Sequence, residues 1–167
     1  SVPHALATRA GMHPDREWLK QRNPDTDQWE AITYGEGLRR TRALAQAFLD
    51  MGAGPDSPVM ILSGNSIETA LVMVAAMTIG APAAPISVPY SLMSTDFAKL
   101  KHCFTSVQSK VLFASQIKPF EPAIGGLGEN VCTVITAAGH NGAMSDQGLL
   151  DTSVTHAVVA ALNKRRD

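Results

Sequence analysis

The chain has 167 residues, and its 14 Lys and Arg against 15 Asp and Glu give a formal net charge of -1 at pH 7. This length suits one compact domain, and the balanced charge argues against nucleic acid or an anionic membrane surface as a partner. The two cysteines, Cys103 and Cys132, are too few for a disulfide framework and lack the spacing of a zinc site.

The first thirty residues are rich in Pro, Arg and Asp, which predicts an irregular surface arm with a short strand at residues 29–33. The arm has no apolar core of the kind that a signal peptide needs, so we expect a cytoplasmic protein. The following domain is expected to occupy residues 31–167.

TYGE at residues 33–36 has the T-x-x-E spacing of a capping box, so a helix is expected to begin there. The segment GAGP at residues 52–55 is expected to end this helix, with glycine supplying a left-handed cap and proline preventing continuation. The apolar stripe predicted for the helix consists of Leu38, Ala45, Phe48 and Leu49, flanked by Leu44 and Met51. The residues predicted to point away from it are Arg39, Arg40 and Arg42.

Residues 59–87 read VMILSGNSIETALVMVAAMTIGAPAAPIS and are almost free of charge. A membrane span needs about 20 largely apolar residues, whereas the longest apolar run here is residues 70–77. The pattern instead predicts a strand at 59–62, a helix at 67–79 and a strand at 83–87. A helix that is apolar on nearly every side is expected to lie between layers.

The rest of the chain continues the alternation of strands and helices. The expected elements are a loop at 88–91, a helix at 94–107, a strand at 110–114, a poor helix at 116–124, a strand at 131–136 and a helix at 154–163. This order predicts an α/β layered domain with a mainly parallel sheet and helices on both faces. The turns at 64–66, 88–91, 115–116 and 137–142 would share the carboxyl edge of that sheet, where open α/β sheets bind ligands.

GNSIE at residues 64–68 has the position of a phosphate loop, between a strand and a helix. It contains one glycine and fits neither the dinucleotide fingerprint nor the P-loop pattern. Capping of the helix by Asn65, with Glu68 three residues later, is the more economical interpretation. Ligand contact is the alternative.

The remaining candidate residues do not have the spacing of a known catalytic or metal-binding site. GGLG at 125–128 precedes a strand and predicts a turn, and His140 in GHNG at 139–142 has no carboxylate or nucleophile at a useful spacing. His102 and Cys103 are helix neighbours whose side chains diverge by about 100°, and His4, His13 and His156 are scattered. We therefore assign no catalytic, cofactor-binding or metal-ligating residue.

Two stretches nevertheless resemble consecutive motifs of the adenylate-forming enzymes, the superfamily of acyl-CoA synthetases, luciferases and peptide-synthetase adenylation domains. ITYGEGL at 32–38 with RALAQAFL at 42–49 is similar to the first motif, and VMILSGNSIE at 59–68 with AAMTIGAPAAPI at 75–86 is similar to the second. PYSLMSTDFAKLKH at 89–102 resembles the corresponding segment of feruloyl-CoA synthase-like members.

The resemblance implies a ligase that forms an acyl-adenylate from an aryl carboxylic acid, such as a hydroxycinnamate, and then an acyl-CoA. It implies ATP, Mg²⁺ and coenzyme A as the cofactors of a full-length parent. The phosphate loop of the family, S/T-S-G-x-T-G-x-P-K, is missing from this sequence. We therefore expect an N-terminal fragment, truncated before that loop, that binds none of these cofactors and is inactive alone.

Two other classes of function stay open. One is a stand-alone interaction module that kept this subdomain and lost catalysis; the other is an unrelated doubly wound nucleotide binder. The coding sequence past residue 167 separates the ligase from the module. A fragment is also expected to expose apolar surface and to self-associate.

Overall fold

The computed structural model describes residues 1–23, 25–127 and 133–136. The helices are α1 (Val2–Met12), α2 (Tyr34–Asp50), α3 (Ile67–Thr78), α4 (Pro89–Leu92), α5 (Ala98–Val107) and α6 (Ile117–Gly125). The strands are β1 (Glu17–Arg22), β2 (Trp29–Thr33), β3 (Val59–Leu62), β4 (Ala83–Pro85), β5 (Val111–Ala114) and β6 (Thr133–Thr136). The predicted helix at 154–163 and turn at 137–142 lie outside the described residues.

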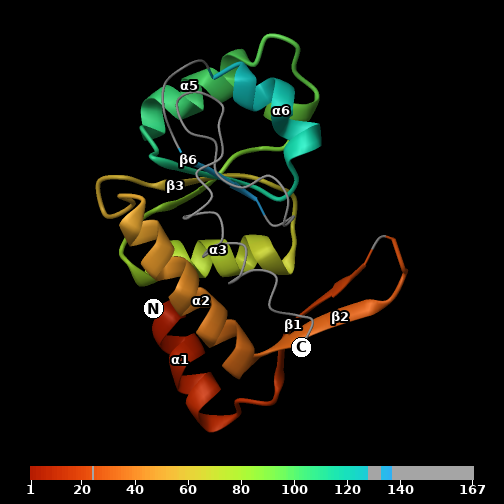
Figure 1. Cartoon of the computed structure of the whole chain (residues 1–167), viewed down its shortest axis with the longest axis vertical. Helices are drawn as coiled ribbons and strands as arrows, with labels where there is room; N and C mark the ends of the chain where they lie inside the picture. The colour runs from red at the N-terminus through yellow and green to blue at the C-terminus, as the bar shows by residue number, and fades with distance from the viewer. Residues whose placement is uncertain (24, 128–132, 137–167) are drawn as a thin grey trace.

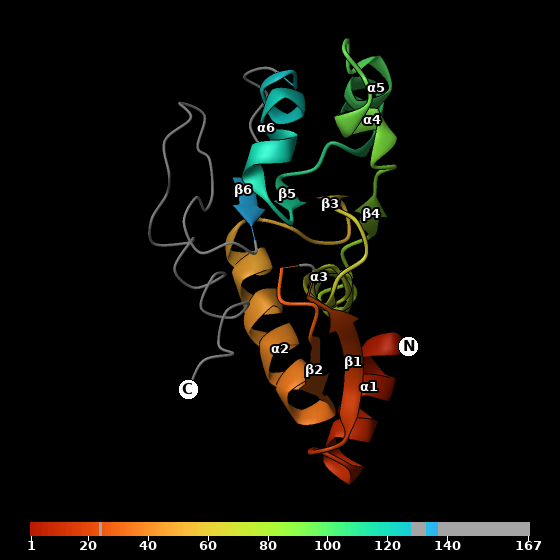
Figure 2. The ribbon, with the colours of Figure 1, turned by 90° about the vertical axis from the view of Figure 1, so that its right-hand side faces the viewer.

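The central sheet has the strand order β4-β3-β5-β6, and all three pairs are parallel. Helices α5 and α6 lie over one face, while α3 and α2 lie on the other side (Figure 1). Seen at right angles, the sheet separates the two groups of helices (Figure 2). The α/β layered fold with a parallel sheet and helices on both faces is therefore confirmed.

Two apolar clusters fill the spaces on either side of the sheet. Val59, Ile61, Val111 and Phe113 belong to the cluster with α2 and α3, and the alternate residues of β3 and β5 belong to the cluster with α5 and α6. Successive side chains of a strand point to opposite faces of the sheet. Strands that are apolar at every position are therefore typical of a sheet that is covered on both faces.

The predicted glycine ending of α2 is confirmed, and α3 ends in the same way. Gly52 (φ 81°) donates to the Leu49 carbonyl, and Ala53 donates to the Phe48 carbonyl, both at 2.9 Å. Gly80 (φ 75°) and the residue after it make the equivalent bonds at the end of α3. This pair of bonds defines a Schellman motif, which requires a left-handed residue after the helix.

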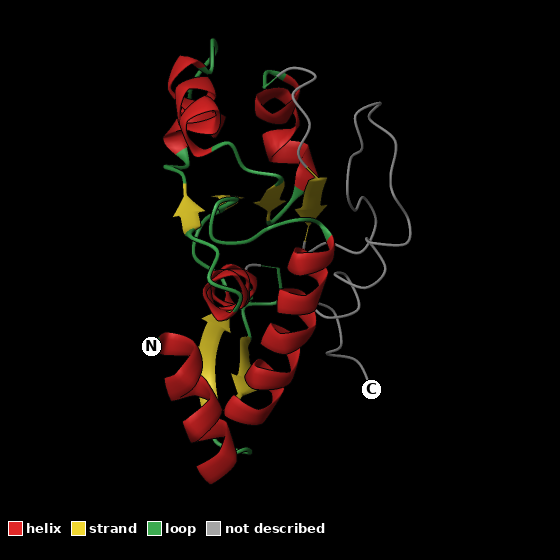
Figure 3. Ribbon diagram, turned by 90° about the vertical axis from the view of Figure 1, so that its left-hand side faces the viewer, coloured by secondary structure: helices red, strands yellow, loops and turns green. Residues whose placement is uncertain are grey.

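The predicted irregular arm is wrong, because the first thirty residues form a helix and a hairpin (Figure 3). Ser1 caps α1 by accepting a hydrogen bond from the His4 amide at 3.4 Å, and Leu6 and Ala10 are the buried residues of that helix. Two buried residues one turn apart are a weak periodic signal, which explains the error. The strand at residues 29–33 is confirmed.

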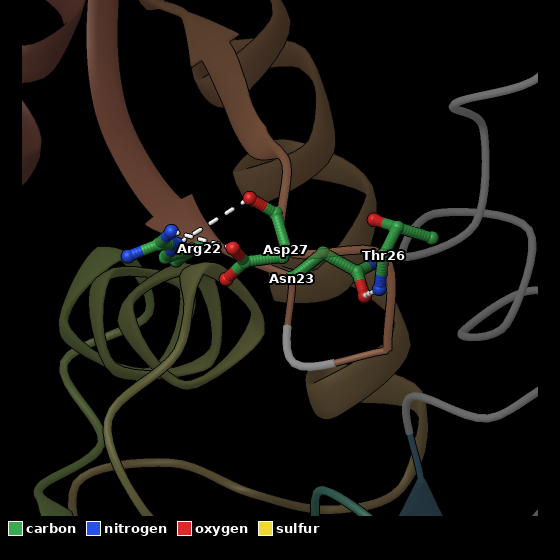
Figure 4. A network of polar contacts seen from close by, with 4 residues as sticks. All are labelled: Arg22, Asn23, Thr26 and Asp27. Carbon is green, nitrogen blue, oxygen red and sulfur yellow. Dashed lines mark hydrogen bonds and ion pairs between the residues drawn. The ribbon is translucent and has the colours of Figure 1, made fainter.

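The β1–β2 hairpin is antiparallel and extends away from the body of the molecule (Figure 1). At its tip, Arg22 Nη2 donates to Asp27 Oδ2 at 2.6 Å, and Asn23 Oδ1 accepts from the Thr26 amide at 3.1 Å (Figure 4). Asp27 has a left-handed backbone (φ 60°), a conformation that Asn and Asp tolerate better than most residues. The side-chain contacts thus close the turn.

Helix α2 confirms half of the predicted capping box. The Glu36 amide donates to Thr33 Oγ1 at 3.2 Å, but the Glu36 carboxylate pairs with Arg39 and lies 3.8 Å from Arg40 Nε. Arg40 is fully buried, so its predicted outward orientation is wrong. Leu49, predicted in the apolar stripe, is 49% exposed.

Several predicted boundaries move in the second half of the chain. Helix α5 begins at Ala98, four residues after the expected start, because Ser94 and Asp96 close a turn before it: Ser94 Oγ accepts from the Phe97 amide and Asp96 Oδ1 from the Ala98 amide, each at 3.0 Å. Residues 89–92 form the short helix α4 where a loop is predicted. Strand β4 stops at Pro85, two residues early.

The Ser109 hydroxyl ties the start of β5 to the start of β3. Its oxygen lies 2.7 Å from the Pro58 carbonyl oxygen and 2.6 Å from that of Val111, and it accepts from the amides of Met60 and Val111. The contacts align the two strands at the pair Val59 and Val111.

We expect Ser109→Ala to lower the free energy of unfolding by about 1–2 kcal/mol, because buried backbone groups lose a hydrogen-bond partner. Urea unfolding followed by circular dichroism measures the effect. Ser106→Ala is the control: its exposed hydroxyl bonds to the His102 carbonyl within α5, and we expect a change within about 0.5 kcal/mol. Equal effects of the two variants would contradict the role of Ser109.

Candidate functional site

The carboxyl edge of the parallel sheet brings together the turns that follow three strands. Residues 63–66 follow β3, residues 86–88 follow β4 and residues 115–116 follow β5. Because the three strands are parallel, their turns share one edge, as predicted. The fourth predicted turn lies outside the described residues, as does His140 within it.

The turn after β3 is closed by hydroxyl groups. Thr69 Oγ1 lies 2.9 Å from both Ser63 Oγ and the Gly64 carbonyl oxygen, and Ser66 Oγ lies 3.1 Å from Thr69 Oγ1. Ser66 Oγ also accepts from the Thr69 amide at 3.0 Å, which makes Ser66 the N-cap of α3. Capping is therefore the correct interpretation of this turn, but the predicted capping residue, Asn65, is wrong by one position.

The hairpin supplies a second cap to the same helix. Gln21 Oε1 accepts a hydrogen bond from the Ile67 amide, the first of α3, at 2.7 Å. Gln21 Nε2 donates to Glu30 Oε2 at 3.4 Å, and Glu30 Oε1 accepts from Asn23 Nδ2 at 2.7 Å. A row of side chains on the hairpin thus ends at the N-terminus of α3.

These contacts decide whether the turn fits a phosphate group. A phosphate at a helix N-terminus binds to free backbone amides, but two of the first three amides of α3 are already bonded. The Ile67 amide donates to Gln21, and the Thr69 amide donates to Ser66 Oγ. Glu68 adds a negative charge in the first turn. The turn at 64–66 is therefore poorly suited to the phosphates of a nucleotide.

Sequence reasoning missed Gln21 because its partner lies 46 residues further along the chain. No local pattern marks a side chain that caps a distant helix. The two residues flank a small pocket of about 200 Å³ between the hairpin and α3, which is lined by Leu19, Lys20, Gln21, Asn65, Ser66 and Ile67.

The loop after β4 and the start of α5 carry the other polar contacts near this edge. Lys99 Nζ lies 5.2 Å from the centre of the Tyr90 ring, a cation–π distance. The hydrogen bond from the Ala98 amide, followed by that from the Ser94 hydroxyl, holds the pKa of Asp96 below its usual value. Both contacts serve the local turn.

The other predicted candidates are not brought together. His102 is exposed, whereas Cys103, its neighbour on α5, packs against the apolar cluster beneath that helix, which confirms their divergence. His4 and His13 lie near opposite ends of α1. Among residues 1–23, 25–127 and 133–136, no three His, Cys, Asp or Glu side chains form a group that could hold a metal ion.

The remaining glycine-rich segment also agrees with its prediction as far as the structure describes it. Gly125 ends α6, and Gly126 follows as its C-cap. Gly128, like Cys132 and His156, lies outside the described residues. Within the described part of the chain, no helix is both long enough and apolar enough to cross a bilayer.

One family model matches most of the chain. The family model described as AMP-binding enzyme matches residues 6–163. The structure is also similar to the N-terminal domain of FACL13 from Mycobacterium tuberculosis, with 22% identity and a TM-score of 0.64 over 81% of this chain and 33% of that chain.

Two further solved structures have the same fold. One is a fatty acyl-adenylate ligase from Legionella pneumophila in complex with acyl adenylate and pyrophosphate, with 18% identity and a TM-score of 0.65 over 81% of this chain and 23% of that chain. The other is the NpsA N-terminal subdomain from Klebsiella oxytoca in complex with 3-hydroxybenzoyl-AMSN, with 23% identity and a TM-score of 0.59 over 81% and 30%. This chain thus spans a third or less of each of these three structures.

Proposed function

Because the chain belongs to the AMP-binding enzyme family, we propose that it is the N-terminal part of an ATP-dependent acid–thiol ligase. The observation that carries this proposal is the family match over residues 6–163. The parallel sheet with helices on both faces agrees with it, since the solved structures named above, one of them a fatty acyl-adenylate ligase, have the same fold. The parent protein would form an acyl-adenylate from a carboxylic acid and ATP, and then an acyl-CoA.

The acid is proposed to be an aryl acid such as ferulate or another hydroxycinnamate. Support comes from PYSLMSTDFAKLKH at residues 89–102, which resembles feruloyl-CoA synthase-like sequences. The segment covers α4 and the first half of α5, next to the carboxyl edge. The three solved structures named above are less than 25% identical to this chain, so they support the fold and not the choice of acid.

ATP, Mg²⁺ and coenzyme A are proposed for the parent and not for this chain by itself. In the turn after β3, which has the position of a phosphate loop, two amides of α3 are bonded to the chain's own side chains. The sequence also contains no S/T-S-G-x-T-G-x-P-K motif. The same proposal places the parent protein in the cytoplasm.

ATP–pyrophosphate exchange tests this function. With ferulate, we expect exchange by the full-length parent and none above the enzyme-free background by the 167-residue chain, because the chain lacks the phosphate loop. Omission of the acid and replacement of ferulate by a saturated fatty acid are the controls.

Each outcome of the exchange assay has a separate meaning. Robust exchange by the 167-residue chain would contradict its predicted inactivity. Preference of the parent for the fatty acid would contradict the aryl substrate but not the ligase. A parent without exchange on either acid would favour the alternative, a non-catalytic interaction module.

A further inference from the structure

We infer that Gln21 is a positioning residue that fixes the turn at the carboxyl end of β3 by accepting the first amide of α3. The turn at 64–66 is short, and the residues on both sides of it are held: β3 by its neighbours in the sheet, and α3 by its caps. Gln21 is the cap that comes from a different part of the fold, the β1–β2 hairpin.

The geometry of the amide explains why Gln21 matters. Ile67 is the first residue of α3, and the first amides of a helix have no acceptor within the helix. Ile67 is also buried, with 2% of its surface exposed, so its amide is largely shielded from bulk water. The Gln21 oxygen at 2.7 Å satisfies a donor that would otherwise be buried without a partner.

The hairpin orients the Gln21 amide group. Gln21 Nε2 donates to Glu30 across the two strands, which directs the oxygen of the same amide toward α3. Asn23 donates to the other oxygen of Glu30 and fixes that carboxylate in turn. The orientation of Gln21 therefore depends on a carboxylate acceptor at position 30.

The inference rests on the proposed function only for its consequence, that this turn is held in place at the edge of the sheet where the parent ligase would bind its substrates. The hydrogen bond itself is tested without any activity, by hydrogen exchange of single amides in the 167-residue chain, followed by NMR. Failure of the exchange assay with ATP and pyrophosphate would therefore leave this test intact.

In Gln21→Ala, we expect the Ile67 amide to exchange about tenfold faster, the loss of one hydrogen bond of ordinary strength. The Leu71 amide, in the interior of the same helix, is the internal control and reports global opening. It should change by no more than about twofold. Equal acceleration of both amides would overturn the inference, because Gln21 would then act only through the stability of the whole fold.

Exchanging the two side chains, by Gln21→Glu together with Glu30→Gln, should restore the protection of the Ile67 amide. Gln21→Glu keeps an acceptor for Ile67 but places a carboxylate beside Glu30, and the repulsion should keep protection incomplete. Adding Glu30→Gln restores a donor and an acceptor in reversed order with the net charge of the natural chain. In this double variant, the exchange rate of the Ile67 amide should return to within about twofold of that in the natural chain. If the Ile67 amide of the double variant still exchanges as fast as in Gln21→Ala, the inference is overturned.

Discussion

Phe113→Ala is expected to lower the free energy of unfolding by about 3–5 kcal/mol, the cost of removing a large side chain from a closed core. Phe113 is fully buried on β5, which lies between β3 and β6. Its ring belongs to the cluster that joins the sheet to α2 and α3. Equilibrium unfolding in urea, followed by far-UV circular dichroism, measures the loss.

Leu112→Ala is the matched variant from the opposite face of the same strand. Leu112 is equally buried, but it belongs to the cluster beneath α5 and α6. A sheet that is covered on both faces requires that this substitution also cost about 2–5 kcal/mol. A change below about 1 kcal/mol would be typical of a less constrained site and would contradict the layered arrangement on that side.

The central sheet could be predicted because its strands carry their own signal. VMIL at 59–62 and VLFA at 111–114 are short apolar runs between turn residues, and every side chain in the two runs is buried. Helix α3 could be predicted for a similar reason, since most of its residues are buried and its sequence is apolar on nearly every side. In such segments the local pattern and the tertiary environment demand the same residues.

Helix α1 and strand β1 could not be predicted, because their structure depends on distant partners. Strand β1 reads EWLKQR and has no fully buried residue; it is a strand because it pairs with β2 and packs on the helices. Arg40 shows the converse: its charge indicates the surface, yet its side chain is enclosed and lies near Glu36. Local polarity was misleading in both cases.

The candidate site divides in the same way. The turns at the carboxyl edge follow from strand direction, which the alternation of strands and helices predicts. No local pattern predicts that the first amide of α3 is already bonded, because its acceptor, Gln21, lies on the distant hairpin. The shift of the cap from Asn65 to Ser66 was a boundary error of one residue, since both types are good N-caps.

Gly37→Ala is expected to lower the free energy of unfolding by about 2–3 kcal/mol, although alanine is the better helix former. A Cβ atom at position 37 would lie 2.3 Å from Trp18 Cε3 and 2.5 Å from Trp18 Cζ3. The indole cannot easily retreat, because it is stacked on Tyr34 with 6.1 Å between ring centroids and packs against the core. Because Gly37 has no Cβ atom, Trp18 of β1 can pack directly against α2 at this position.

Gly11→Ala provides the control for helix propensity. Gly11 lies in α1, and beyond the adjoining backbone no atom of the described residues lies within 4 Å of the point that an alanine Cβ would occupy. We therefore expect this variant to gain up to about 1 kcal/mol. Opposite signs for two identical substitutions would attribute the loss at Gly37 to contact with Trp18. Urea midpoints give the stabilities, and tryptophan fluorescence reports the displacement of the indole.

Trp18→Leu in the Gly37→Ala background separates a steric clash from a general loss of packing. Leucine is smaller than the indole, so the double variant should be less destabilised than the sum of the two single variants, with a coupling of about 1 kcal/mol or more. Additive effects would mean that Gly37 and Trp18 act independently. In that case the hairpin would be held on α2 by its other contacts, chiefly by Ile32, which is buried in the same cluster.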